Sequence, residues 1–110
     1  MNIWVEVMHE GETLYKITHS ASSIPQLTRM ICEAMSAVMD ANNDHLPLPL
    51  EVRAGRWGES VAASMSGTTR NWELLFVGGR QQGEGKTKNI EDAYTAVAQW
   101  VIDGDFPEEV

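Results

Sequence analysis

Residues 70–102 constrain the fold of this chain more than any other segment, because they read as a strand, a polar loop and an amphipathic helix in succession. In an extended chain, residues 70–77 place three large apolar side chains on one side, namely Trp72, Leu74 and Phe76. Apolar residues also occur on the opposite side, which predicts an inner strand. Asn89 is expected to cap a helix whose apolar residues recur every three or four positions, and Gly104 is expected to end it. The strand and the helix should therefore pack together, with the other elements around them.

The preceding segments predict a hairpin, a helix and two further strands. Residues 3–8 and 13–18 alternate in polarity on either side of a polar turn. A helix is expected over residues 24–41, capped by Ser23 with Gln26 three residues later, and strands are expected over 46–53 and 60–65. Pro47 and Pro49 cannot donate to a sheet, so the first of these two strands should lie at an edge or begin late. The order ββαβββα predicts one α+β domain, an antiparallel sheet of about five strands with two helices packed on one face.

The formal charge of −8 is unevenly distributed along the 110 residues. Residues 1–52 carry −5, residues 53–88 carry +3 and residues 89–110 carry −6. Nucleic-acid binding draws its affinity from clustered lysine and arginine, so this composition disfavours nucleic acid as a direct partner. It favours attraction to a basic protein surface, and the alternative is that the acidity only keeps a small protein in solution.

The residues that usually mark catalytic or metal sites do not form such a pattern here. The three histidines lack companions at metal-ligand spacing, and the serines lack a glycine-flanked nucleophile elbow, so we expect no enzyme activity, metal or cofactor. Cys32 is the single cysteine and is expected to be buried in the first helix. No apolar run approaches the roughly 20 residues that span a bilayer, and the N-terminus lacks a signal-peptide pattern, which favours a cytoplasmic protein.

The segment Gly78–Thr87 is interpreted as a loop, and it ends in the Gly-Lys-Thr of a phosphate-binding P-loop. The spacing does not fit the motif, because Arg80 occupies the position of the first glycine. The structural interpretation is a plain connection from a strand to a helix. Phosphate or nucleotide binding is retained as an alternative function, with four candidate residues: Arg80, Lys86, Thr87 and Lys88.

The leading hypothesis is a small acidic binding protein that inhibits a basic or nucleic-acid-handling macromolecule. Toxin immunity proteins and phage inhibitors of bacterial defence nucleases, including anti-CRISPR proteins, are the classes in which such a molecule would act. The expected partner is a nuclease, a toxin or a nucleic-acid-binding complex. Trp57 lies beside an arginine in a bend, a composition typical of binding hot spots. The candidate partner-binding residues are the hairpin acids, this tryptophan and the acidic tail over residues 104–110: Glu6, Glu10, Glu12, Trp57, Asp103, Asp105, Glu108 and Glu109.

A structural homodimer is a third possibility. The first helix is rich in methionine, and the strand over residues 46–53 is expected at a sheet edge. Either surface would allow two copies of the chain to pair.

Overall fold

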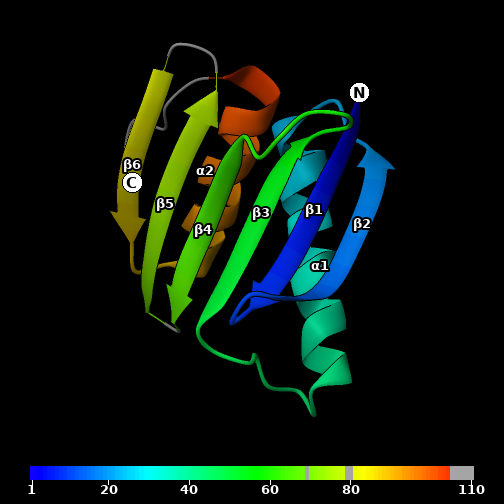
Figure 1. Cartoon of the computed structure of the whole chain (residues 1–110), viewed down its shortest axis with the longest axis vertical. Helices are drawn as coiled ribbons and strands as arrows, with labels where there is room; N and C mark the ends of the chain where they lie inside the picture. The colour runs from blue at the N-terminus through cyan, green and yellow to red at the C-terminus, as the bar shows by residue number, and fades with distance from the viewer. Residues whose placement is uncertain (69, 79–80, 105–110) are drawn as a thin grey trace.

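The computed structural model describes residues 1–68, 70–78 and 81–104, which form an antiparallel sheet and two helices (Figure 1). The six strands of this described part lie in the order β2-β1-β3-β4-β5-β6. Both helices pack on the same face of the sheet, α1 mainly over β1 and β2 and α2 over β3 to β6. The α+β class is confirmed. The element order ββαβββα is also confirmed, apart from the additional strand β6. The elements are β1 Asn2–His9, β2 Glu12–Ser20, α1 Ile24–Ala41, β3 Leu50–Arg56, β4 Ala63–Thr68, β5 Asn71–Gly78, β6 Gln81–Thr87 and α2 Ile90–Asp103.

The helix ends confirm the capping residues that the sequence predicts. The Ser23 hydroxyl accepts a hydrogen bond from the Gln26 amide at 3.3 Å at the start of α1. Asn89 caps α2, since its side-chain oxygen accepts from two amides in the first turn. Gly104 ends α2 with a φ of 71°, a left-handed conformation that glycine adopts without a steric penalty.

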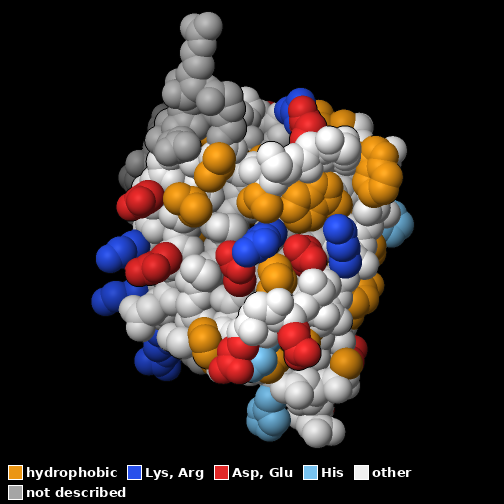
Figure 2. Space-filling view, in the orientation of Figure 1, with side chains coloured by type: hydrophobic (Ala, Val, Ile, Leu, Met, Phe, Trp, Pro, Cys, Tyr) orange, Lys and Arg blue, Asp and Glu red, His pale blue; other side chains and the backbone are white. Residues whose placement is uncertain are grey.

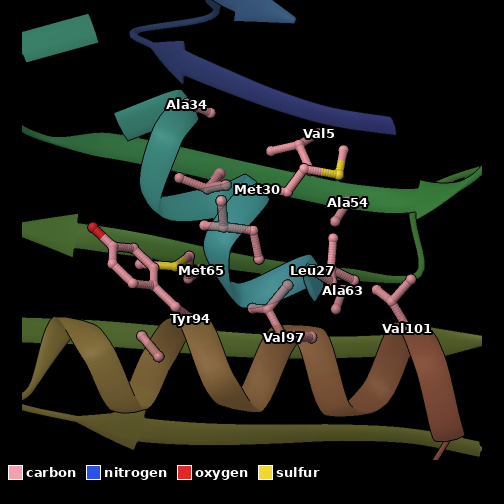
Figure 3. Packing of buried hydrophobic residues seen from close by; sticks show 14 of the residues in the cluster. Val5, Leu27, Met30, Ala34, Ala54, Ala63, Met65, Tyr94, Val97 and Val101 are labelled. Carbon is pink, nitrogen blue, oxygen red and sulfur yellow. The ribbon is translucent and has the colours of Figure 1, made fainter. Parts of the chain in front are cut away.

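The core lies between the sheet and the two helices. Figure 3 shows side chains of α1 and α2 meeting over the central strands, where β3 and β4 carry the small residues Ala54 and Ala63. Leu27 from α1 and Val97 from α2 are fully buried there. Small residues in the sheet allow the two helices to approach it closely, and the helices also contact each other.

β6 is a sixth strand, where the sequence predicts about five strands and a loop over 78–87. Residues 81–87 pair with residues 72–78 of β5. Gly83 and Gly85 stand opposite Phe76 and Leu74 on the helix-facing side, so β6 contributes backbone hydrogen bonds but almost no side chains to the core. A strand without apolar residues has no hydrophobic periodicity, which explains why the pattern alone indicates a loop.

Two strand assignments also differ from expectation. The strand expected over residues 46–53 is β3, which begins late at Leu50 and lies in the middle of the sheet between β1 and β4. The late start, one of the two alternatives that the prolines predict, is confirmed, whereas the edge position is wrong because β1 and β4 occupy both sides of β3. β3 therefore has no free edge along which two copies could pair, and a homodimer through α1 stays a prediction. Pro47 and Pro49 precede β3, so neither interrupts its ladder. The next strand, expected over 60–65, is displaced to Ala63–Thr68.

Cys32 is exposed on α1, whereas the sequence predicts that it is buried. The apolar stripe of α1 faces the sheet through Leu27, Ile31 and neighbouring positions, and Cys32 falls outside that stripe. Met30 and Met35 are buried as part of the stripe. Position on the helix, rather than residue type, determines burial here.

Tyr94 of α2 predicts an alkaline pH dependence of stability. Burial, together with the negative charges of a Cys32 thiolate and Glu91, raises the pKa of Tyr94 to about 12. The neutral phenol therefore stabilises the fold fully below the unfolded-state pKa of 10.0, and this stabilisation is lost as the pH rises from there towards 12. We expect Tyr94→Phe to lose less stability than the wild type over this interval. Urea denaturation of both proteins at a series of alkaline pH values checks this, and identical pH slopes would contradict it.

Candidate binding surface on the open face of the sheet

The face of the sheet opposite the helices is not covered by any described element, and we call it the open face (Figure 2). Strand alternation and the antiparallel register align its side chains in rows across the sheet. One row runs through Arg53, Ser64, Leu75 and Glu84. The next row runs through Glu51, Ser66, Glu73 and Lys86. The open face therefore combines opposite charges with short hydroxyl side chains on β4.

A hollow runs along β4, where serines lie between longer side chains of β3 and β5. This β4 groove has a volume of about 550 Å³ and is lined by Glu51, Ser64, Ser66, Glu73, Leu74, Leu75, Glu84, Gly85 and Lys86. A second hollow of about 550 Å³ adjoins it, since both share Glu51, Ser66 and Glu73. Glu10 of the hairpin turn lines this second hollow. These volumes fall within the range of about 300–1,000 Å³ typical of ligand sites.

Four carboxylates line these hollows and outnumber the cations there, and two of the four have no ion-pair partner among the described residues. The described residues form two ion pairs within 4.0 Å, Arg53 with Glu51 at 3.1 Å and His9 with Glu10 at 3.9 Å. Glu73 and Glu84 belong to neither, although Lys86 stands opposite Glu73 in the sheet register. The groove therefore presents acceptor groups and a net negative charge to solvent.

The Trp4 side chain also lies on the open face, near the start of β1 and opposite Gly55 of β3. It is buried, but it lies on the open face and not in the core between sheet and helices. The indole N–H donates to the Glu59 carbonyl at 3.2 Å, and the Lys16 ammonium lies 5.4 Å from the ring centroid. Gly55 leaves the room for this ring, because a Cβ at that position would lie 2.8 Å from Trp4 Cζ2.

Gly55→Ala should displace the Trp4 ring and destabilise the protein. The added methyl group would also lie 2.8 Å from the Ser60 carbonyl oxygen, so the backbone offers no relief. Overpacking of this kind costs about 1–3 kcal/mol of unfolding free energy. Urea denaturation measures the loss, and tryptophan fluorescence reports the ring's new surroundings. Unchanged stability together with an unchanged spectrum would contradict this account of Trp4.

The predicted partner-binding residues lie at different ends of the molecule. Trp57 is 66 % exposed, as expected, and its amide bonds the Asn2 carbonyl at the start of β1. Arg56 donates to the carbonyls of Val101 and Ile102, which places the end of α2, with Asp103, at this same end.

Glu10 and Glu12 lie beyond the other end of β1, which is about 23 Å away along the strand, and Glu6 lies within β1. Of these acids, Glu6 lies on the open face, where it accepts a hydrogen bond from Thr13 at 2.7 Å, and Glu10 lines the second hollow. Glu12 starts β2 and is exposed. The tail residues Asp105, Glu108 and Glu109 lie outside the described residues.

The candidate phosphate-binding residues do not surround free helix amides. Lys86 projects on the open face, and the Thr87 hydroxyl accepts from the Asn89 amide at 3.1 Å. The first-turn amides of Glu91 and Asp92 already bond the Asn89 side chain, so they are not available to a phosphate as a P-loop requires. Lys88 is exposed beside them, and Arg80 lies outside the described residues. Within the described ranges, no group of three or more His, Cys, Asp or Glu side chains is placed to hold a metal ion.

Sequence reasoning missed Glu51, Ser64, Ser66 and Glu84 as site residues. Alternation does mark Glu73 as facing away from the core strand residues. The other four positions can be recognised as neighbours only when β6 is known to pair with β5 and β3 with β4, because those pairings align the side chains in rows. β6 is polar and contains two glycines, so its sequence gave no signal that it pairs with β5.

Comparison with protein-family models, curated proteins and solved structures found no match to this chain. Neither described helix is long and apolar enough to span a lipid bilayer. The structure defines an α+β protein with one sheet face that no described element covers.

Proposed function

We propose that this chain is a non-catalytic binding protein that places its open face against a basic surface of another macromolecule and blocks that surface. The observation that supports this most is the uncovered face of the six-stranded sheet, with the acidic β4 groove at its centre. Unpaired carboxylates there attract a basic partner and would be satisfied by its lysine or arginine side chains.

The edges of the open face add contacts that charge alone would not supply. Leu75 is 45 % exposed beside the groove, and Trp57 is exposed at the end of the sheet where β3 turns. Exposed aromatic and aliphatic side chains near a polar surface are the usual anchors of an interface. The partner we propose is a nuclease, a toxin or another nucleic-acid-handling protein, and the setting we propose is the cytoplasm, as for immunity and anti-defence proteins.

Affinity capture from a lysate of the source organism tests this function. The wild-type protein is immobilised, and retained proteins are eluted by raising the salt from low to moderate concentration. We expect a basic protein that leaves the column as salt rises, because screening at about 0.15 M salt already reduces the range of exposed charges to about 8 Å.

A neutralised bait provides the control, with Glu73→Gln and Glu84→Gln on the open face. A matched bait carries Glu33→Gln and Asp40→Asn, two exposed acids of α1 on the opposite side of the sheet. Capture by the wild type and the matched bait alone would support the proposal. Equal capture by all three baits, or retention of only a second copy of the chain, would contradict it.

A further inference from the structure

The floor of the β4 groove carries the hydroxyl of Ser64, a largely buried residue of β4. Ser64 is 8 % exposed and lines the groove, yet its hydroxyl has no hydrogen-bond partner among the described residues. The buried side-chain atoms without a partner in the described residues are Thr28 Oγ1 and Trp72 Nε1, so the Ser64 hydroxyl is accessible from the groove and can bond a ligand there. Ser66 lies two residues further along β4 on the same face, and its side chain also has no partner in the described part of the chain. The floor of the groove is therefore prepared for a ligand that donates hydrogen bonds.

The walls of the groove add negative charge on both sides of this floor. In the register, Glu51, Ser66 and Glu73 stand side by side on three adjacent strands. Neighbouring strands lie about 4.8 Å apart, so the two glutamates are attached to backbones about 9–10 Å apart with the serine between them. Glu51 is already paired with Arg53 at 3.1 Å, which leaves Glu73 and Glu84 as the carboxylates able to take an external cation.

From this arrangement we infer that the β4 groove binds an arginine side chain of the partner protein. This inference rests on the proposed function and specifies its central contact. A guanidinium has five N–H donors and no acceptor, which matches a site made of carboxylate and hydroxyl oxygens. Its planar fork pairs with the Glu73 carboxylate in two parallel hydrogen bonds, and its remaining N–H groups reach the serine hydroxyls. Leu75 offers an apolar wall for the methylene stem.

The chemistry of the groove favours arginine over other cations. The described carboxylates do not converge in the groups of three that would hold a metal ion. A lysine ammonium has three donors at one point, and therefore cannot reach Glu73, Ser64 and Ser66 together as the wider guanidinium does. The groove is open along β4, so an extended segment of the partner could lie above it while one side chain enters.

Nuclear magnetic resonance titration of the labelled protein with a glycine-spaced triarginine peptide tests this inference. We expect the amide signals of Ser64, Ser66 and Leu75 to shift. The same peptide with citrulline, which keeps the shape but lacks the charge, should give no saturable shift, and the trilysine peptide should bind more weakly than the arginine peptide. Equal binding of the lysine or citrulline peptide, or signal changes confined to the helices, would overturn the inference.

Two variants separate recognition from folding. Glu73→Gln should lower the affinity for the arginine peptide by about tenfold, because a charge-assisted bidentate pair is lost. Ser64→Ala should lower the affinity for this peptide by about threefold. The urea midpoint should stay unchanged, because the hydroxyl has no partner to lose among the described residues. The pair Glu33→Gln and Asp40→Asn on α1 serves as the control and should bind the peptide as the wild type does.

The outcomes distinguish this inference from the function on which it rests. If the peptide does not bind, but a captured partner still depends on Glu73 and Glu84, the arginine anchor is rejected and the proposed function stands. If the peptide binds with the expected dependence on Glu73, the anchor is supported. If the peptide affinity falls equally in the α1 control pair, the binding is general electrostatic attraction and the anchor is rejected.

Discussion

Trp100→Ala should destabilise the protein by about 3–5 kcal/mol, the usual cost of removing a large aromatic side chain from a core. Trp100 is buried on α2, and its ring centroid lies 5.6 Å from that of Phe76 on β5. Its indole N–H donates to the Val77 carbonyl at 3.1 Å. The Trp100 side chain thus connects α2 to β5, and the substitution removes both contacts together. Urea denaturation gives the free energy of unfolding.

Trp57→Ala is the matched control for this substitution. The same side chain is removed, but Trp57 is 66 % exposed at the end of β3, so its loss should change stability by no more than about 0.5 kcal/mol. Comparable losses for the two variants would contradict the assignment of Trp100 to the core and of Trp57 to the surface.

Charge reversal in the β4 groove should have the largest effect on binding. With Glu73→Lys and Glu84→Lys together, we expect the affinity for the captured partner to fall by roughly a hundredfold, because two attractive contacts become repulsive at the centre of the interface. Both side chains are exposed, so the fold should tolerate the change. Surface plasmon resonance measures the affinity, and circular dichroism confirms the fold.

The control for charge reversal is Glu33→Lys with Asp40→Lys on α1. This variant has the same net charge as the groove variant, but its lysines lie on the opposite side of the sheet. We expect its affinity to stay within about threefold of the wild type, the change that weak long-range attraction allows. An equal loss in both variants would show that net charge, and not the open face, governs binding.

The elements with strong apolar periodicity were predictable from the sequence. The hairpin, both helices and β5 follow from alternation, caps and the helical stripe, and Ser23, Asn89 and Gly104 act at the ends where the sequence places them. Burial follows as well for Trp72 and Trp100, which lie on the apolar sides of their elements. These features depend on local sequence, which a pattern can report.

The sheet order and the site depend on long-range pairing, which a local pattern cannot report. β3 is central because β1 pairs with it after an intervening helix, and its late start, after Pro47 and Pro49, keeps both prolines outside the ladder without placing the strand at an edge. β6 forms because β5 offers an edge whose backbone groups β4 leaves unpaired, and not because of its own side chains. The groove is a consequence of both pairings, since its walls come from β3, β5 and β6 and its floor from β4.

The location of the bound partner can be measured directly from the methyl signals of the labelled protein in the complex. Met8, Leu75 and Val77 lie on the open face, whereas Ile24, Met39 and Ile102 lie on the helix side, and all six are at least partly exposed. We predict that saturation transferred from the unlabelled partner reaches the methyl groups of the first three residues and leaves those of the other three unchanged. Transfer to the helix-side methyl groups, with the open-face signals unaffected, would contradict the claim that the open face is the binding surface.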